Sequence, residues 1–425
     1  MYFVYSLLLW IALVFYLPVY YVRLKLKRKE SLYLTRRLGI RVPRIERGKK
    51  AIWIHAVSVG EVLSLRRLIQ EMKRKHPSWE ICFSTLTNAG YQVAREKIPD
   101  ADHIFFIPFD FGFSVRKFFK ALHPSLLVLV ESEFWPHLLR EAKRHSCPVL
   151  LVNGRISDRT SRKLLRFKFL ARRVLQNIDR FLVQTEKDKE RLEPIGIPSM
   201  RIDVSGNLKS EVHLPEVSEE SIMNLKNELS VPQGKKIIVA GSIHKGEERL
   251  LLEAFTEARK QNREILLVLA PRHPEKFNEL NKLFMNYQLK FQRKTAVKPG
   301  DSWDVLVLDT IGELVRFYAL SDVAFIGGSL IPWGGQNLLE PAFYRKPIFF
   351  GPHMNNFAFL AEEFVRSQAA RIVQNKEDLV EMFLCGDEAR LRKMGERAWE
   401  LLMSLQGATE ETLAAIEAFV ATGRE

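Results

Sequence analysis

From residue 51 onward, short apolar runs alternate with longer amphipathic segments. The runs are rich in Val, Ile, Leu and Phe, which is typical of buried strands, whereas segments such as 61–75 repeat apolar residues at helical spacing. Strands and helices in alternation predict parallel sheets covered by helices on both faces, which is an α/β fold. In the first half the predicted strands are 51–57, 80–86, 103–109, 126–132, 148–154, 180–185 and 201–207.

The pattern breaks once and then starts again. Residues 208–232 are polar and acidic, contain Pro215 and Pro232, and predict a connection with one helix. Two Rossmann-like domains are therefore expected, with a cleft between them at the carboxyl ends of their strands. The second-half strands are expected at 235–242, 264–272, 304–310, 322–329 and 346–352, followed by helices from about residue 376. The predicted regions are a membrane anchor (1–22), a basic membrane-proximal segment (23–50), a first domain (51–210), a connection (211–232), a second domain (233–400) and a C-terminal helix (401–425).

The first 22 residues are apolar and aromatic and carry no charged side chain. About 20 such residues can cross the hydrocarbon core of a bilayer as a helix. A signal peptide is disfavoured, because no basic region precedes the apolar run and no small-residue cleavage site follows it. A single N-terminal membrane anchor is the prediction, and two placements stay open: a helix that spans the bilayer and a helix that lies in its interface.

The positive charge of the chain is concentrated next to this anchor. The chain has 65 Lys and Arg against 50 Asp and Glu, a net charge of +15. Residues 23–50 hold twelve basic residues against two Glu, so this segment accounts for +10 of that charge. By the positive-inside rule the segment and everything after it lie on the cytoplasmic side. The expected partner is an anionic membrane rather than nucleic acid, and the alternative is a solvated linker.

Three cysteines without a CxxC motif, Cys82, Cys147 and Cys385, disfavour a disulfide scaffold and a zinc site. No His or carboxylate spacing resembles a metal motif, so neither a metal nor another cofactor is expected.

The glycine-rich segment 327–352 is the first candidate site. Glycines such as Gly334 and Gly335 before a helix let backbone N–H groups approach a phosphate, with Asn337 as a plausible cap. Glu340 could accept hydrogen bonds from sugar hydroxyls. The alternative is that the glycines only make turns.

Three further loops follow predicted strands of the second half. They supply Ser242, His244 and Glu247, then Arg272 and His273, and then Gly312 and Glu313. Because the carboxyl ends of parallel strands meet at one sheet edge, we expect these loops to share an anionic ligand.

The first half carries a second candidate site. Glu61 opens a predicted helix, where the helix dipole favours an ionised carboxylate that could act as a general base. Ser58 and Glu61 also have the spacing of a capping box, which is the structural alternative. Glu131 and Glu133 end another strand, and Lys209 follows the last one, where a cation could stabilise a leaving phosphate.

Residues 153–173 have eight basic residues to one acid. They include Arg155 and Arg159, which are candidates for binding lipid phosphates beside a membrane. A solvated helix face is the alternative.

Seven motifs follow one another along the chain: HAVSVGE, VESEFWP, GNLKS, AGSIHKGE, PRHPE, DTIGEL and GGQNLLEP. In this order and spacing they resemble the 3-deoxy-D-manno-octulosonic acid (Kdo) transferases of Gram-negative lipopolysaccharide synthesis. This resemblance implies the GT-B fold, with the acceptor bound by the first domain and the nucleotide sugar by the second. It implies an inverting transfer of Kdo from CMP-Kdo to the lipid A precursor (lipid IVA), at the cytoplasmic face of the inner membrane.

The resemblance also assigns residues. Glu61 corresponds to the general base, and Glu131 and Lys209 to stabilisers of the transition state. Family members commonly have His where this chain has Gln336, which puts any proton-related role of that position in doubt. The residues implied to contact CMP are Pro271, Arg272, Ile311, Gly312, Glu313, Asn337, Leu338, Leu339 and Glu340.

Two rival functions remain. One is a GT-B transferase that uses a UDP-sugar on another membrane lipid. The other is a non-enzymatic basic membrane adaptor or nucleic-acid binder, which would be indifferent to Glu61→Ala. The number of Kdo residues transferred and the oligomeric state are not specified by the sequence.

Overall fold

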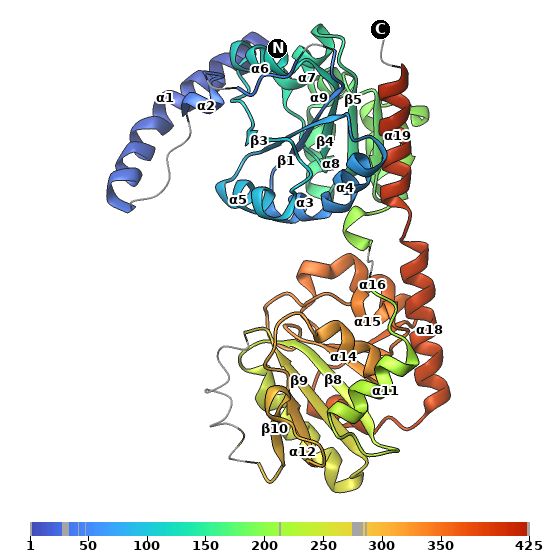
Figure 1. Ribbon diagram of the computed structural model, residues 1–425. Coiled ribbons are helices and arrows are strands. Elements are labelled where there is room, and N and C mark those ends of the chain that lie inside the picture. Colours follow the sequence, from blue (N-terminus) through green and yellow to red (C-terminus); the bar gives the residue numbers. More distant parts are fainter. Residues whose placement is uncertain are drawn as a thin grey trace. The chain divides into compact units, whose positions relative to one another are not determined.

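The computed structural model describes residues 2–27, 34–40, 42–46, 48–211, 214–273, 284 and 287–422, and the side chains of 16–27, 34, 35 and 422 lie outside this description. The chain forms two compact units (Figure 1). Unit 1 comprises Met1–Glu211 and Gln406–Glu425, and unit 2 comprises Val212–Leu405.

Unit 1 is built on a parallel seven-stranded sheet in the order β3-β2-β1-β4-β5-β6-β7, counted over the described residues. Side chains alternate between its two faces: Trp53 packs into the apolar cluster on one face, and Ile52 and Ile54 into the cluster on the other. The strands are β1 (Ala51–Ala56), β2 (Glu80–Thr85), β3 (His103–Phe106), β4 (Pro124–Val130), β5 (Val149–Gly154), β6 (Arg180–Val183) and β7 (Ile202–Val204).

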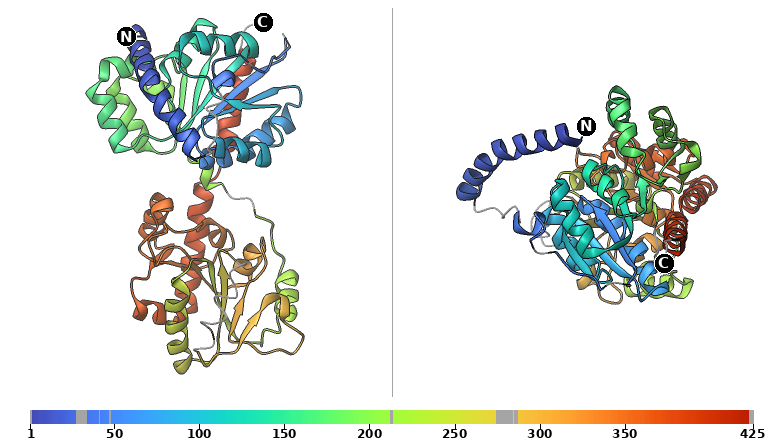
Figure 2. Two further views of the ribbon diagram at one scale, coloured as in Figure 1. Left: turned by 90° about the vertical axis from the view of Figure 1, so that its left-hand side faces the viewer. Right: turned by 90° about the horizontal axis from the view of Figure 1, so that it is seen from above.

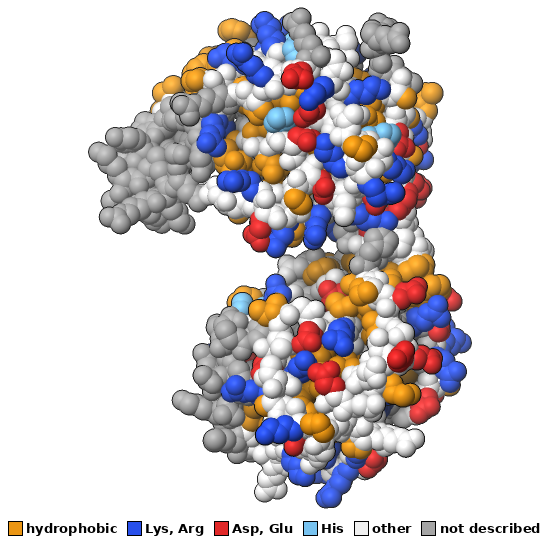
Figure 3. Space-filling model, in the orientation of Figure 1, with side chains coloured by type: hydrophobic (Ala, Val, Ile, Leu, Met, Phe, Trp, Pro, Cys, Tyr) orange, Lys and Arg blue, Asp and Glu red, His pale blue; other side chains and the backbone are white. Residues whose placement is uncertain are grey.

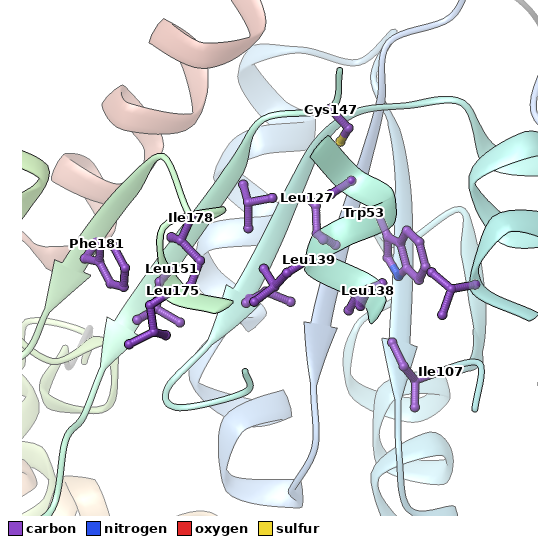
Figure 4. Close-up of a cluster of buried hydrophobic side chains, with 14 of the residues drawn as sticks. Trp53, Ile107, Leu127, Leu138, Leu139, Cys147, Leu151, Leu175, Ile178 and Phe181 are labelled. Carbon is purple, nitrogen blue, oxygen red and sulfur yellow. The ribbon is translucent and has the colours of Figure 1, made fainter. Parts of the chain in front are cut away.

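Helices cover both faces of this sheet. Figure 4 shows the cluster around Trp53, where Leu138 and Leu139 reach the sheet from the helix above it. The last helix of the chain lies on the opposite side of unit 1 from the first (Figure 2). The helices are α1 (Tyr2–Lys27), α2 (Leu34–Arg37), α3 (Val59–Ser64), α4 (Arg66–Lys75), α5 (Asn88–Lys97), α6 (Gly112–Leu122), α7 (Pro136–Arg144), α8 (Asp158–Arg166), α9 (Lys168–Leu175), α10 (Glu186–Leu192) and α19 (Ala408–Thr422), with 3₁₀ turns at Glu193–Ile195, Ser199–Arg201 and Leu208–Ser210.

Unit 2 repeats this plan with the strand order β10-β11-β9-β8-β12-β13-β14, again parallel throughout the part of the chain that is described. Its strands are β8 (Lys236–Ile243), β9 (Ile265–Pro271), β10 (Phe291–Arg293), β11 (Val305–Val307), β12 (Val323–Ile326), β13 (Ile348–Phe350) and β14 (Ala370–Ile372). Its helices are α11 (Glu219–Glu228), α12 (Glu247–Gln261), α14 (Leu314–Leu320), α15 (Leu339–Phe343), α16 (Ala358–Arg366), α17 (Lys376–Leu384) and α18 (Glu388–Ser404), with 3₁₀ turns at Lys294–Ala296 and Asn355–Phe357.

Every predicted strand is present, and the α/β prediction with two parallel sheets is confirmed. Two short strands, β10 and β14, were not predicted, because three residues with little apolar content carry too weak a pattern. The connection contains its single helix, α11, which belongs to unit 2: the indole N–H of Trp303 donates to the Leu229 carbonyl at its end, over 2.8 Å.

The prediction of a single helix over 401–425 differs from the structure. The helix α18 ends at Ser404 and α19 begins at Ala408. Gly407 lies between them with φ +100°, a left-handed conformation that favours glycine and ends helices. The chain returns to unit 1 after this break, since α19 packs in the apolar cluster beneath β1 and β4.

The N-terminal helix is present as α1, but the prediction of a spanning anchor is not supported: among the residues that the structure describes, no helix is long and apolar enough to cross a membrane. Within the basic segment 23–50, residues 28–33, 41 and 47 lie outside the described residues. Arg37 contradicts a purely membrane-facing role for this segment. It is buried in unit 1 and donates to the Ile107 carbonyl over 3.0 Å.

Candidate functional site

In each sheet the strands are added first toward one edge and then toward the other, and the place where this order reverses is the switch point. Ligands of open α/β sheets bind outside the carboxyl ends of the strands at this point. In unit 1 this place lies between the paired strands β1 and β4, and in unit 2 between β8 and β12. The loops after these four strands carry most of the predicted site residues. Ser58 and Glu61 follow β1, Glu131 follows β4, and Ser242 and His244 end β8 or follow it.

Glu61 is buried at the start of α3 and belongs to a complete capping box. Its Oε2 accepts the Val57 N–H at 2.8 Å, and its Oε1 accepts the backbone N–H of Ser58 at 3.2 Å and the Ser58 hydroxyl at 2.7 Å. The structural alternative is therefore present, and it also fixes the carboxylate in one orientation. Oε1 has both lone pairs occupied, whereas Oε2 accepts one hydrogen bond and keeps one pair.

Lys209 joins the loops of this edge. Its ammonium contacts Oε1 of Glu131 at 2.6 Å. A Cβ atom placed on Gly60 would lie 3.9 Å from Lys209 Nζ, so the ammonium also lies beside the backbone that begins α3. Unit 1 thus brings together three residues predicted from separate motifs, Glu61, Glu131 and Lys209.

Two features that hold this cluster were not predicted. Glu131 has φ +58°, a left-handed conformation that costs a non-glycine residue about 1–3 kcal/mol and is concentrated at functional sites. Asn153, at the end of β5, accepts the Leu208 N–H at 3.1 Å and so fixes the 3₁₀ turn that carries Lys209. Asn153 is itself left-handed, with φ +52°, a conformation in which Asn is enriched among the non-glycine residues.

Glu133, the second acid of the strand end, is held apart from Lys209. Its Oε2 accepts the indole N–H of Trp135 at 2.8 Å. Burial raises the pKa of Glu133 above its ordinary value, and the negative charges of Glu61 and Glu131 act in the same direction. The cluster therefore holds three carboxyl groups, of which Glu131 has a cationic partner in Lys209.

The glycine-rich loop of unit 2 is organised by Glu247, a fully buried acid that was expected to face a ligand together with Ser242 and His244. Its two oxygens accept four backbone N–H groups, which belong to His244 (2.9 Å), Gly328 (2.6 Å), Ser329 (2.9 Å) and Leu330 (2.9 Å). An internal anion thus occupies the position at which a phosphate was expected.

The glycines after β12 serve the turn and the packing instead. Gly334 and Gly335 both have positive φ, +95° and +75°. The Gly335 N–H is bonded to the Gly328 carbonyl at 2.8 Å, and a Cβ atom on Gly335 would lie 2.2 Å from the sulfur of Met354. The prediction that this loop cradles a phosphate with its glycine N–H groups is therefore wrong for Gly328 and Gly335, because protein acceptors already occupy both.

The following residues place Glu340 in the first turn of α15. Asn337 donates to Glu340 Oε1 at 3.2 Å and accepts the Leu339 N–H at 3.1 Å, so it caps the helix from one residue before the N-cap, Leu338. Burial raises the pKa of the Glu340 carboxyl. The side chains of Leu338 and Leu339 are buried in the core, so only their backbone could meet a ligand.

His244 follows β8 and contacts two residues of the glycine-rich loop. Its Nε2 is 3.0 Å from Nε2 of Gln336, and its ring stacks on Trp333 with 4.9 Å between centroids. Burial lowers the pKa of His244, and the nearby charge of Arg272 lowers it further. Arg272 also acts on Glu340, so the loops after β8, β9 and β12 meet.

The remaining predicted residues are less closely placed. Pro271 ends β9, and Ile311 is 87% exposed beside Gly312, which has φ +89°. Glu313 occupies the N-cap position of α14 without a side-chain capping bond, and its carboxylate pairs with Lys294 at 3.4 Å and with Arg316 at 3.6 Å.

Ser242 has φ +55°. Its carbonyl packs against Gly327 so closely that a Cβ atom there would lie 2.4 Å away. This residue shapes the loop through its backbone.

Arg155 and Arg159 are exposed at the end of β5 and the start of α8. On the face of the molecule shown in Figure 3, Lys and Arg side chains are interspersed with Asp and Glu rather than gathered in one patch.

Comparison with known proteins gives this arrangement a family. The sequence pattern described as 3-deoxy-D-manno-octulosonic-acid transferase (kdotransferase) matches residues 33–212. The 3-deoxy-D-manno-octulosonic acid transferase of Haemophilus influenzae is 30% identical over 369 residues, which are 86% of each chain. That of Chlamydia pneumoniae is 29% identical and covers 89% of this chain and 86% of its own.

Among solved structures, the UDP-GlcNAc 2-epimerase of Neisseria meningitidis has a TM-score of 0.56 at 13% identity, over 87% of this chain and all of its own, which is a likeness of fold alone. Both units share the GT-B-like architecture of such proteins. From the identity to the transferases over most of both chains, this chain is an enzyme, a glycosyltransferase that belongs to the family of the 3-deoxy-D-manno-octulosonic acid transferases.

Proposed function

We propose that this chain transfers Kdo from CMP-Kdo to the lipid A precursor with inversion at the sugar carbon, at the cytoplasmic face of the inner membrane. The observation that carries the proposal is the cluster at the switch point of unit 1. There a buried, oriented carboxylate, Glu61, lies in the loop cluster where the Lys209–Glu131 pair contacts the start of α3. A carboxylate can take the proton of an alcohol, and a cation beside it can stabilise the negative charge of a departing phosphate.

Glu61 is the proposed general base, acting through Oε2. This oxygen keeps a free lone pair, whereas Oε1 is filled by its two bonds from Ser58. The proton of the acceptor hydroxyl moves to Oε2 while the hydroxyl oxygen bonds to C2 of Kdo. The bond from C2 to the phosphate oxygen breaks, and CMP leaves with that electron pair. One displacement of this kind inverts the configuration at C2.

Lys209 is the proposed stabiliser of the negative charge that develops on the phosphate. The contact of 2.6 Å with Glu131 holds the flexible lysine side chain in one place before the reaction. Glu131 therefore acts by positioning Lys209, and its left-handed backbone at the end of β4 places its carboxylate for that contact.

Donor binding is proposed for the loops that follow β8, β9 and β12 in unit 2. Arg272 supplies the positive charge there, since the N–H groups of Gly328 and Gly335 are already bonded. Glu340 and the backbone of residues 337–339 are suited to hydroxyl and carbonyl groups of the nucleotide. Binding of CMP is further proposed to involve Pro271, Ile311, Gly312 and Glu313, and binding of the sugar His244 and the backbone of Ser242.

The lipid acceptor and the anionic membrane are the remaining proposed partners. Exposed basic residues of unit 1, Arg155 and Arg159 among them, are placed to pair with lipid phosphates, each worth roughly 1 kcal/mol near a membrane surface.

The test is transfer by the purified full chain in detergent. CMP-Kdo made in situ and tetraacyl lipid A precursor should give a product whose mass rises by one or more Kdo units, and CMP should raise the melting temperature more than UDP does. Stabilisation by UDP alone, with consumption of a UDP-sugar and no Kdo transfer, would instead establish the rival donor. Tight, salt-sensitive binding of nucleic acid without any transfer would establish the non-enzymatic alternative.

A further inference from the structure

A cavity of about 560 Å³ opens on the surface of unit 1, on the side that carries α1. Its volume lies within the range of sites for small molecules, about 300–1,000 Å³. One wall is α1, through Val4, Tyr5 and Leu8, and the opposite wall is formed by α8 and α9, including Leu170 and Val174. The cavity belongs to neither switch point.

The lining is almost wholly apolar. Only Tyr5 and Lys163 bring polar atoms, and the Tyr5 hydroxyl is already bonded to Asp110 at 3.0 Å. Several lining side chains remain exposed in spite of their apolar character, Leu8 by 58% and Phe167 by 58%. An exposed apolar surface of this kind indicates a binding site for an apolar partner.

The wall formed by α1 is fixed in place by polar bonds and is not a loosely attached segment. Besides the Tyr5–Asp110 bond, the Ser6 hydroxyl lies 2.8 Å from Nε2 of His137, and Arg140 lies over the ring of Tyr2 at 4.4 Å. Trp10 packs on Phe111 at 4.7 Å. The cavity is therefore preformed, which lowers the entropic cost of filling it.

Charge selects the occupant. Lys163 lines the cavity, and the two helices of that wall, α8 and α9, carry further exposed basic residues: Arg162, Arg166, Lys168, Arg172 and Arg173. Asp158 is the one acid among residues 153–173. An apolar cavity lined by one lysine, on helices rich in exposed basic residues, complements a molecule that has a long hydrocarbon chain next to a negative group.

We propose that this cavity holds an acyl chain of the phosphorylated lipid acceptor, with a lipid phosphate at Lys163. The inference rests on the proposed function for the identity of the lipid and deepens it by assigning a subsite for the chain. The cavity thereby selects acylated over deacylated acceptors.

The direct test uses cis-parinaric acid, a fluorescent long-chain acid, with the full chain in detergent-free buffer. We expect saturable binding by the wild type, displacement by tetraacyl lipid A precursor, and at least a tenfold loss of affinity in Leu170→Glu and in Leu8→Glu, which place a carboxylate in the two walls. Phe169→Glu is the matched control, since Phe169 is 76% exposed next to Leu170 and does not line the cavity. Its affinity should change less than twofold.

A second readout links the cavity to transfer. The KM for tetraacyl acceptor should rise at least tenfold in Leu170→Glu, while the KM for the same disaccharide bisphosphate without acyl chains should change less than twofold. Equal effects of Leu170→Glu and Phe169→Glu would reassign this surface to general bilayer contact, and a change of oligomeric state in Leu170→Glu would reassign it to a second copy of the chain. Absence of saturable binding by the wild type would also overturn the inference. If parinaric acid binds as expected but no Kdo is transferred, the cavity stands and the proposed function fails.

Discussion

At the residue scale, each unit has a buried glutamate that accepts backbone N–H groups at the start of a helix. Glu61 and Glu247 each lie in the first turn of a helix that follows a strand, and each accepts hydrogen bonds from backbone N–H groups of the preceding loop. They differ in the lone pairs that their carboxylate oxygens keep free. Glu247 accepts four N–H groups with both oxygens, whereas Glu61 keeps a free lone pair on Oε2. The first is therefore equipped to hold a loop and the second to take a proton.

Glu247→Gln should destabilise unit 2 strongly. The amide keeps one acceptor oxygen but turns an NH₂ group toward buried N–H donors, and unsatisfied buried donors cost about 1–3 kcal/mol each. We expect a loss of about 3 kcal/mol or more in the free energy of unfolding, measured by urea denaturation of the full chain.

The matched control for this change is Glu253→Gln on the same helix. Glu253 is 3.6 Å from Arg249 in a largely exposed pair, and such pairs are worth little. The control should stay within about 0.5 kcal/mol of the wild type. Equal losses in both variants would show that the four bonds to Glu247 do not hold the loop.

At the scale of elements, the two ends of the chain are both held on unit 1. The first turns of α1 bond to Asp110 and His137, and α19 buries an apolar stripe against α4 and β4. The second attachment includes a contact of 2.7 Å between His76 and Glu417. An uncharged apolar run predicted the helix at the N-terminus, and a helix was also predicted over 401–425, but hydropathy alone could not show where either one docks.

The docking of α1 should depend on pH through Asp110. Burial raises the pKa of Asp110 from 3.8 to about 7, so the folded protein holds this proton more tightly than the unfolded chain. The resulting stabilisation is complete below about pH 4 and is lost as the pH rises toward 7. Between pH 4 and 8 the wild type should lose about 2–4 kcal/mol more stability than Asp110→Asn, measured by urea denaturation. Parallel pH profiles for the two proteins would contradict this assignment.

Ile416→Ala should destabilise unit 1, although residue 416 follows unit 2 in the sequence. Ile416 is fully buried in the cluster beneath β1 and β4, and removal of such a side chain costs about 2–5 kcal/mol. Hydrogen exchange should accelerate in α3 and α4 and stay unchanged in α12. The exposed Glu411→Ala on the same helix should cost less than about 1 kcal/mol. Faster exchange in α12 instead would show that α19 stabilises unit 2 and not unit 1.

At the scale of the whole molecule, the chain repeats one architecture twice, and this much could be predicted. Parallel strands buried on both faces leave a strong sequence pattern, and motifs at their carboxyl ends pointed to Glu61, Glu131 and Lys209 together. The occupants of the N–H groups could not be predicted, because Gly328 and Gly335 look the same in the sequence whether a phosphate or Glu247 fills the loop. The sequence likewise does not indicate the apolar cavity between α1 and the pair α8 and α9, because this cavity forms only when α1 packs on unit 1.

The central claim is that Glu61 is the base of a Kdo transfer, and Glu61→Gln tests it most directly. Gln can replace Glu in a capping box, so α3 should be retained, and Gln cannot accept the proton. Its NH₂ group would face the Val57 N–H, so the free energy of unfolding should fall by about 1–3 kcal/mol. We predict that the turnover of CMP-Kdo and tetraacyl lipid A precursor falls about 10²–10⁴-fold while the Kd for CMP stays unchanged. Turnover within a few-fold of the wild type, in a variant that stays folded and binds CMP equally well, would contradict the account.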